Sequence, residues 1–219
     1  MTQKILEANS SKFSNTILQK SRIQTIQIVK DFAKNLPLGI TENEAKTRLE
    51  GVFNKAGSTK FWHPTKFRIG INTNKSFRDT SDEGITLQED DVFFIDIGPI
   101  LDGHEADYGE TFCNGEKFNF LANASKEVFN KTAKIWKEET ITGAQLYDKA
   151  SQIAKEMGYT LNTKMAGHRI GDFPHHIHYR GSLDEVDFHP IENTWILEIH
   201  LIHDETGYGT FFEDILIGD

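Results

Sequence analysis

Four acidic side chains lie in two segments of the sequence that each have the pattern of a β-hairpin. The pairs and their turn signals are Asp96 and Asp107 around Asp102-Gly103, and Glu198 and Glu213 around residues 204–207. Residues at equal distances from an antiparallel turn have Cβ atoms about 5 Å apart, so each hairpin is expected to place its two acids side by side. The surrounding residues are Phe, Ile and Leu, and carboxylates that repel each other in apolar surroundings require a cation or a shared proton.

A histidine between the two hairpins adds a nitrogen to this set of oxygens. His168 lies in the segment Gly-His-Arg-Ile-Gly, where it offers a neutral imidazole. One nitrogen with several carboxylates suits a pair of divalent transition ions bridged by carboxylates. A single Asp in an apolar strand is usually an edge or turn residue, but two matched pairs at mirrored positions favour a metal site.

These motifs resemble the pita-bread-fold metallopeptidases, the family of methionine aminopeptidase, aminopeptidase P, prolidase and the non-peptidase creatinase. The resemblance rests on the 11-residue spacing of the two aspartates, the Gly-His-x-Ile-Gly segment and the two late glutamates, and it covers about residues 40–219. It implies a centre of two divalent ions, of the type Mn, Co, Fe or Zn. The implied ligands are Asp96, Asp107, His168, Glu198 and Glu213.

The resemblance also implies a mechanism. Asp107 and Glu213 would bridge the ions, a metal-bridged hydroxide would attack the scissile carbonyl, and Glu198 would accept and return the proton. His175, seven residues after His168, falls where the family keeps a substrate-binding catalytic histidine. It would stabilise the oxyanion of the tetrahedral intermediate.

One catalytic residue of the family has no counterpart in the sequence. The family peptidases carry a second histidine upstream of the first ligand aspartate, but residues 75–79 here read Lys-Ser-Phe-Arg-Asp. His63, which follows Trp62, is the nearest upstream histidine. We expect it to replace the missing residue in part, the alternative being an ordinary loop residue.

Three functions remain open from the sequence. The first is a dinuclear-metal aminopeptidase or dipeptidase, of the Xaa-Pro or Met type, that hydrolyses N-terminal residues of short peptides. The second is a creatinase-like or other small-molecule enzyme on the same scaffold. The third is a binding protein whose catalysis is impaired, which the missing histidine favours and the complete ligand set opposes.

Further histidines are concentrated in the same part of the chain. Seven of the nine lie between positions 168 and 203. His200 shares a strand face with Glu198 by alternation, so it has the strongest claim among them to be an additional ligand. Alternation sends His176 and His178 to one face, and we expect them to face solvent, the alternative being extra ligands or polar contacts to the substrate. The sequence leaves the role of His203 open.

The elements that position these residues follow from helix caps and apolar stripes. A stripe from about Ser10 to Asn35 predicts a core-facing amphipathic helix within an N-terminal segment of residues 1–38. Capping boxes at Thr41-x-x-Glu and Thr142-x-x-Gln open two further helices, 101 residues apart, which end at glycines with the same separation. We therefore expect two similar halves, the second beginning with a helix over about 121–138.

Together with the resemblance, this repeat predicts an α/β (α+β) pita-bread fold. We expect a pseudo-twofold, curved, mainly antiparallel sheet flanked by helices, in a single catalytic domain over residues 1–219. A length of 219 residues, with 37% hydrophobic and 26% charged residues, is typical of one globular domain.

Composition also restricts the kinds of partner that the protein can have. The formal net charge of −9 disfavours nucleic-acid binding. No apolar run approaches the ~20 residues of a membrane span, no secretory segment is recognisable, and one cysteine allows no internal disulfide. We expect a cytoplasmic protein whose partner is a peptide or small-molecule amide substrate, with a homodimer left open.

Overall fold

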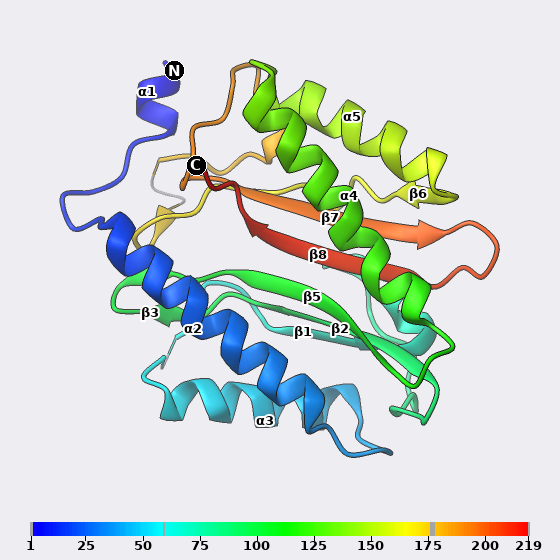
Figure 1. The fold of residues 1–219 in the computed structure, drawn as a ribbon. Coiled ribbons are helices and arrows are strands. Elements are labelled where there is room, and N and C mark those ends of the chain that lie inside the picture. Colours follow the sequence, from blue (N-terminus) through cyan, green and yellow to red (C-terminus); the bar gives the residue numbers. More distant parts are fainter. Residues whose placement is uncertain (1, 59, 176–177, 219) are drawn as a thin grey trace.

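The computed structural model describes residues 2–58, 60–175 and 178–218, and it is built around one six-stranded antiparallel sheet (Figure 1). The strand order is β1 (Lys66–Ile69), β2 (Asp91–Ile97), β5 (Tyr108–Asn114), β8 (Gly209–Ile215), β7 (Ile196–His203) and β6 (Tyr159–Leu161). A two-stranded hairpin, β3 (Ile100–Leu101) and β4 (His104–Glu105), extends the β2–β5 connection. The two halves of the chain each supply three strands and meet where β5 pairs with β8.

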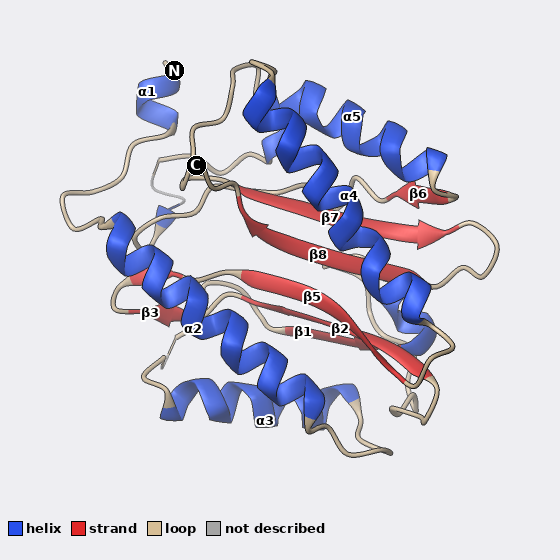
Figure 2. Ribbon diagram, in the orientation of Figure 1, coloured by secondary structure: helices blue, strands red, loops and turns tan. Residues whose placement is uncertain are grey.

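Two pairs of helices accompany the sheet. Figure 2 shows the two long helices crossing the same face, while the other two lie near opposite edges. Their bounds are α2 (Asn15–Lys34), α3 (Glu42–Lys55), α4 (Asn119–Glu138) and α5 (Gly143–Glu156), and the short elements are α1 (Gln3–Leu6), η1 (Gly70–Asn74) and η3 (Leu183–Glu185). Helix α3 contacts β1 and helix α5 contacts β6, so each half repeats the same arrangement of two helices on three strands.

The helix starts show how local sequence set this repeat. Both capping boxes are formed: the Thr41 hydroxyl accepts from the backbone of Glu44, and the Thr142 hydroxyl from the backbone of Gln145. Helix α2 begins later than predicted, at Asn15 after the cap residue Ser14. The Ser14 hydroxyl caps the helix by accepting from the Ile17 backbone N–H, and the segment before it bends towards Asp172, whose Oδ1 accepts from the Ser10 backbone N–H at 3.1 Å.

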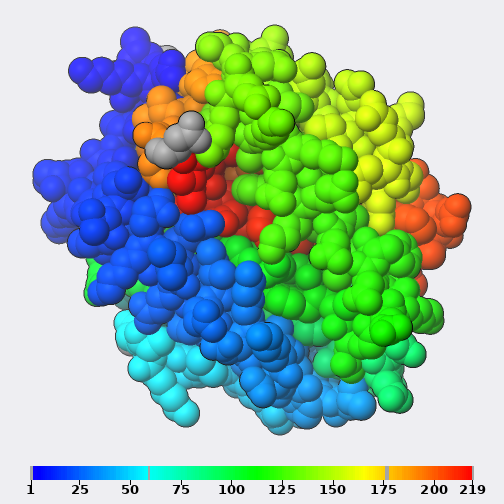
Figure 3. Space-filling model, in the orientation of Figure 1, coloured from blue at the N-terminus to red at the C-terminus, as the bar shows by residue number. Residues whose placement is uncertain are grey.

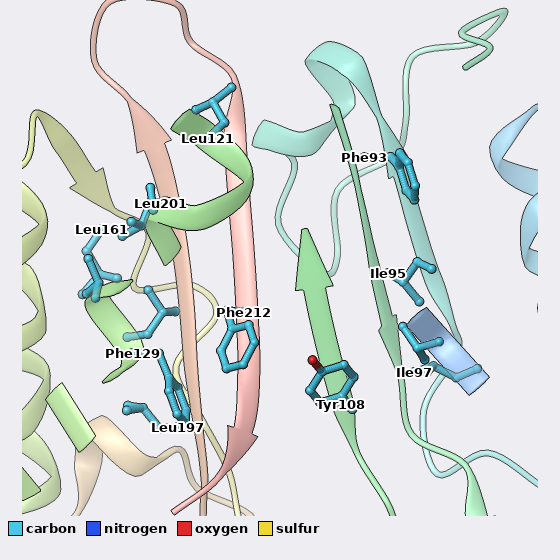
Figure 4. Packing of buried hydrophobic residues seen from close by; sticks show 14 of the residues in the cluster. Phe93, Ile95, Ile97, Tyr108, Leu121, Phe129, Leu161, Leu197, Leu201 and Phe212 are labelled. Atoms are coloured by element: carbon cyan, nitrogen blue, oxygen red, sulfur yellow. The ribbon is translucent and has the colours of Figure 1, made fainter. Parts of the chain in front are cut away.

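Strand alternation separates an apolar face from a polar one. Figure 4 shows Ile95, Ile97, Leu197 and Phe212 in the buried hydrophobic cluster, which also includes residues of α4 such as Phe129. Each such side chain contributes about 1.5–3 kcal/mol on burial. A register slip of one residue would turn these side chains away from the helices and the acids towards them, so the apolar face fixes the orientation of the acids.

The space-filling view shows the helix-covered side of the molecule. Helices α2 and α4 cover much of this face, with part of the C-terminal strand visible between them (Figure 3). In the described part of the chain, every helix is too short or too polar to cross a membrane.

Candidate metal centre

A row of three carboxylates crosses the sheet on the face opposite the apolar cluster. Asp96 pairs with Gly109, Gly109 with Glu213, and Glu213 with Glu198, so the three acids stand at one level on three strands. Gly109 lies between Asp96 and Glu213 in this row and has no side chain. A Cβ at this position would lie 2.3 Å from the Phe211 ring and 3.0 Å from Glu213 Cγ, so the close approach of the two hairpins requires a glycine.

The predicted register of the second hairpin is right, and that of the first is wrong by two residues. Glu198 and Glu213 face each other as expected. The first turn has left-handed φ angles of 49° at Asp102 and 77° at Gly103, as a tight two-residue hairpin turn requires. That turn pairs Asp96 with Gly109, and Asp107 lies two residues before Gly109, directly before β5 begins. Asp107 therefore reaches the site diagonally.

The predicted imidazole ligand meets Asp107. His168 Nε2 lies 3.0 Å from Asp107 Oδ2, and its Nδ1 lies 2.6 Å from the Arg169 carbonyl oxygen. The His168 carbonyl accepts from the backbone N–H of Ile196, which ties this loop to the start of β7. Gly167 permits the approach, since a Cβ there would lie 2.1 Å from the Ile196 oxygen.

Among the described residues, two trios offer ligand atoms that lie within 4.8 Å of one another. They are His63, Asp96 and Asp107, and Asp107, His168 and Glu213. The fifth predicted ligand, Glu198, lines the same pocket. The structure therefore brings all five predicted ligands together, and Asp107 belongs to both trios.

The acids repel one another in a buried setting. Burial raises the pKa of Glu213 well above its usual value, and Asp107 and Asp96 raise it further. Burial and the same two aspartates also raise the pKa of Glu198. Burial alone would raise the pKa of Asp107 too, but His63 and His168 outweigh it and lower that pKa.

One carboxylate oxygen at the site has no hydrogen-bond partner. Glu213 Oε1 is buried and unpaired among the described residues. A buried unsatisfied oxygen is costly, and a divalent cation is the partner that would satisfy it and offset the repulsion of the acids. The residues at the site therefore fit the metal ions that the sequence motifs imply.

His63 lies beside the carboxylates. Its Nε2 is 3.1 Å from Asp107 Oδ1 and 3.4 Å from Asp96 Oδ1, and its Nδ1 is 3.1 Å from the Pro64 carbonyl oxygen. Burial disfavours the charged imidazole, but Asp96 and Asp107 outweigh burial and raise the pKa of His63 to about 9. His63 is thus a residue of the site.

His175 is buried next to the site and is held by an acid that sequence reasoning missed. Its Nδ1 lies 2.5 Å from Glu105 Oε2, and its backbone N–H donates to Glu105 Oε1 at 3.1 Å. Its ring packs against Trp62 and His168, with centroid distances of 5.0 and 5.5 Å. Glu105 stands two residues before Asp107 on one side of the strand, a spacing that could have indicated it.

Trp62 is the second residue that sequence reasoning missed. Its indole N–H donates to Asp107 Oδ2 at 3.1 Å, and its ring lies 4.5 Å from each of the rings of His63 and His168. A Cβ at Gly98 would lie 2.1 Å from the indole nitrogen, so this glycine makes room for the ring. The position of Trp62 directly before His63 is the sequence signal that could have indicated its place in the site.

Two of the additional histidines, His200 and His203, are hydrogen-bonded to other residues of the protein. His200 is fully buried, its Nε2 lies 2.7 Å from the Thr73 carbonyl oxygen, and its Nδ1 lies 2.9 Å from Asn162 Nδ2. Both ring nitrogens are therefore used within the protein, and burial lowers the pKa of His200 to about 4. His203 Nδ1 contacts Thr206 in the hairpin loop. His176 lies outside the described residues.

A pocket of about 400 Å³ opens above the carboxylates. Phe77 and Met165 contribute apolar wall, and Phe77 occupies the segment that has no histidine. The Phe77 ring lies 5.6 Å from the ring of His63. Three exposed cationic residues also line the pocket: Arg78, Lys164 and Arg180. His175 is not among the described residues that line it.

The sequence and the fold were compared with known proteins. The model of metallopeptidase family M24 matches residues 16–217, whereas no curated protein matches the chain. The fold is similar to prolidase from Pyrococcus horikoshii OT3, with a TM-score of 0.75 and 20% identity over 99% of this chain and 62% of that one. It is also similar to X-Pro aminopeptidase from Thermotoga maritima MSB8, with a TM-score of 0.73 and 20% identity over 92% of this chain and 60% of that one.

A shorter protein matches over nearly its whole length. Methionine aminopeptidase from Thermotoga maritima has a TM-score of 0.74 and 14% identity, over 97% of this chain and 98% of that one. The chain thus spans about 60% of the length of the X-Pro aminopeptidase and the prolidase. The pita-bread fold expected from the sequence motifs is confirmed by these similarities.

Proposed function

We propose, since the chain belongs to metallopeptidase family M24, that it is a dinuclear-metal-dependent peptidase that hydrolyses short peptides at their N-terminal residue. The observation that carries this proposal is the convergence of five buried or partly buried ligands on one face of the sheet, at the floor of a pocket. The proposed ligands are Asp96, Asp107, His168, Glu198 and Glu213.

The two trios suggest how the ligands divide. Asp107 belongs to both, so its carboxylate is the proposed bridge. Glu213 is the second proposed bridge, because it belongs to one trio and has a buried oxygen without a partner. Asp96 would complete one set, and His168 and Glu198 the other. Carboxylates with imidazole suit Mn, Co, Fe or Zn. Such ions, when bound, would acidify a water molecule and polarise the scissile carbonyl.

Two side chains are proposed to handle protons and charge. Glu198 is partly exposed to the pocket, where it would accept and return the proton of the hydrolytic water. His175 would donate to the reacting carbonyl from Nε2, while Glu105 holds its Nδ1. A carboxylate in that position orients an imidazole and stabilises positive charge on it. Trp62 and His168 pack against the ring of His175 and hold it next to the carboxylates.

The pocket favours small substrates with a free carboxylate. A volume of about 400 Å³ suits a peptide of a few residues. Arg78, Lys164 and Arg180 along the pocket would form charge-assisted hydrogen bonds with the C-terminal carboxylate of a dipeptide. We therefore propose the dipeptidase type over an aminopeptidase that acts on long chains.

The test is a substrate panel with the Mn²⁺- or Co²⁺-loaded protein. Xaa-Pro and Met-Xaa dipeptides are compared with their C-terminal amides and with longer peptides of the same N-terminal sequence. We expect hydrolysis of the free dipeptides and at least a tenfold lower kcat/KM for the amides. Lys164→Gln should reduce that difference, and Lys155→Gln, at an exposed position of α5, is its matched control. A loaded protein that cleaves no peptide would contradict the proposal.

The alternative enzyme class has one observation in its favour. Phe77, which has no nitrogen to offer a peptide, stands in the segment where the family peptidases have a histidine. A creatinase-like hydrolase would therefore use the same pocket for a small amide. Adding creatine to the panel separates the two, because only this alternative predicts that creatine is cleaved faster than the dipeptides.

A further inference from the structure

His63 and His168 approach Asp107 in matching ways from two sides. His63 Nε2 lies 3.1 Å from Asp107 Oδ1, and His168 Nε2 lies 3.0 Å from Asp107 Oδ2. We propose that His63 is a sixth protein ligand of the metal centre and supplies the ion at Asp96 with an imidazole of its own. This inference rests on the proposed function and adds a ligand that the five-residue set lacks.

The second ring nitrogen supports a ligand role for both histidines. Nδ1 of His63 lies 3.1 Å from the Pro64 carbonyl oxygen, and Nδ1 of His168 lies 2.6 Å from that of Arg169. A carbonyl oxygen can only accept, so Nδ1 carries a proton in each ring, and Nε2 is the nitrogen that a metal ion would bind in place of a proton. This is the arrangement in which metal-bound histidines are held, with the far N–H on a backbone carbonyl or a carboxylate.

The distances around His63 match those of a coordination site. Its Nε2 lies 3.4 Å from Asp96 Oδ1 as well as 3.1 Å from Asp107 Oδ1. Ligand atoms that are each about 2.1 Å from one transition ion lie about 3 Å apart when the bonds are near perpendicular. The two separations at His63 Nε2 are therefore close to those expected between ligands of one such ion.

The ring of His63 is fixed in this position. It is 8% exposed, and the rings of Trp62 and Phe77 meet it edge-on at 4.5 and 5.6 Å. On the loop side, a Cβ at Gly98 would lie 2.6 Å from His63 Cδ2. The imidazole thus lies against the carboxylates at the wall of the pocket, a position from which it could bind an ion held by Asp96 and Asp107.

An imidazole at each ion has a consequence for metal preference. Nitrogen ligands suit Co and Zn better than Mn, which accepts all-oxygen surroundings. Replacing His63 with Gln should therefore weaken Co²⁺ binding more than Mn²⁺ binding. Gln can still hydrogen-bond to Asp107, so the variant separates a ligand role from a hydrogen-bonding role.

The test is a titration of metal-free protein with Co²⁺, in which calorimetry and the visible absorption of the bound ion measure binding. Wild type should bind two ions, and His63→Gln should bind one of them at least tenfold more weakly. His168→Gln should weaken the other ion, and His189→Gln, whose ring stacks on Trp136 away from the site, is the control. Wild-type affinities and spectrum in folded His63→Gln, with loss in His168→Gln, would overturn the sixth ligand and leave the proposed function intact.

A second measurement does not depend on a variant folding. In the Co²⁺-loaded wild type, the ring N–H protons of ligand histidines give strongly shifted, exchangeable proton resonances. We expect two such resonances, from the Nδ1–H groups of His63 and His168. A single resonance with two bound ions would overturn the proposal for His63. A wild-type protein that binds no Co²⁺ would overturn the metal centre itself.

Discussion

Glu198 and Glu213 stand directly opposite each other on β7 and β8, with their side chains on the site face of the sheet. Burial and the nearby aspartates raise the pKa of both carboxyls well above the usual value. A direct cross-strand pair of like charges is destabilising unless something neutralises it. The pair therefore makes stability depend on what occupies the site.

The effect of Glu213→Gln on stability should change sign when metal is bound. An acid whose pKa is higher in the folded than in the unfolded state makes the free energy of unfolding fall as pH rises. The fall begins near pH 4.5 and ends at the pKa of the folded state, and it is at most about 1.36 kcal/mol per pH unit. Glu213→Gln removes that cost, so in EDTA at pH 7 the variant should be more stable than wild type. With Mn²⁺ or Co²⁺ it should be less stable than wild type. Denaturant unfolding with and without metal measures both.

The pH series is the control for this prediction. The difference between Glu213→Gln and wild type in EDTA should shrink towards zero as pH falls to about 4.5, because both side chains are then neutral. A variant that is less stable than wild type in EDTA at pH 7 would show that Glu213 is a favourable partner in the empty site.

Gly109→Ala should disrupt the junction of the two halves. The added methyl would lie 2.3 Å from the Phe211 ring, in the row that joins Asp96 to Glu213. Overpacking of this kind costs about 1–3 kcal/mol, and we expect weaker metal binding as well. Gly51→Ala in α3 is the matched control, since its Cβ meets nothing within 4 Å and should stabilise by about 0.5–1 kcal/mol. Equal stability changes in the two variants would refute the steric argument.

Asp107→Asn should lower the metal content. The two Asp107 oxygens each face a histidine nitrogen, and the amide keeps the shape but removes the charge that a bridging ligand supplies. We expect elemental analysis to find at most one ion per chain, against two in wild type. Asp214→Asn is unsuitable as a control because Asp214 pairs with Arg22; Asp148→Asn on α5 serves instead. If Asp107→Asn still binds two ions per chain, Asp107 is not a bridging ligand.

Glu105→Gln tests the positioning of His175. The variant keeps a hydrogen-bond acceptor but loses the charge that faces Nδ1. We expect kcat to fall about tenfold to a hundredfold, because the lost charge would stabilise charge that develops in the reaction. The metal content and KM should change little. Glu110→Gln, an acid that binds Tyr108 on the opposite face, should leave kcat unchanged. A loss of metal in Glu105→Gln would assign it to the ligand set instead.

Local signals in the sequence predicted much of this arrangement. Both capping boxes and the pairing of Glu198 with Glu213 are as expected, because caps and turns act over a few residues. The predicted register of the first hairpin is wrong because the tight two-residue turn, and not the spacing of the acids, determines which residues pair. A count from the turn at Asp102-Gly103 gives the observed pairing.

Contacts between distant segments could not be predicted in the same way. Glu105 and His175 are 70 residues apart, and Trp62 and Asp107 are 45 apart, so their contacts arise only when the loops pack on the sheet. Alternation placed His200 on the face of Glu198 but could not show that the Thr73 carbonyl already occupies its Nε2. Tertiary packing decides which of several histidines remain available to a metal.

The most direct test of the metal centre is a crystal structure of the protein grown with Mn²⁺, with anomalous scattering recorded at the manganese edge. The account predicts two anomalous peaks about 3.5–4 Å apart, with Asp107 and Glu213 in contact with both. Asp96 should contact one ion, and His168 and Glu198 the other. A single peak, or peaks that lie away from these five side chains, would contradict the dinuclear centre.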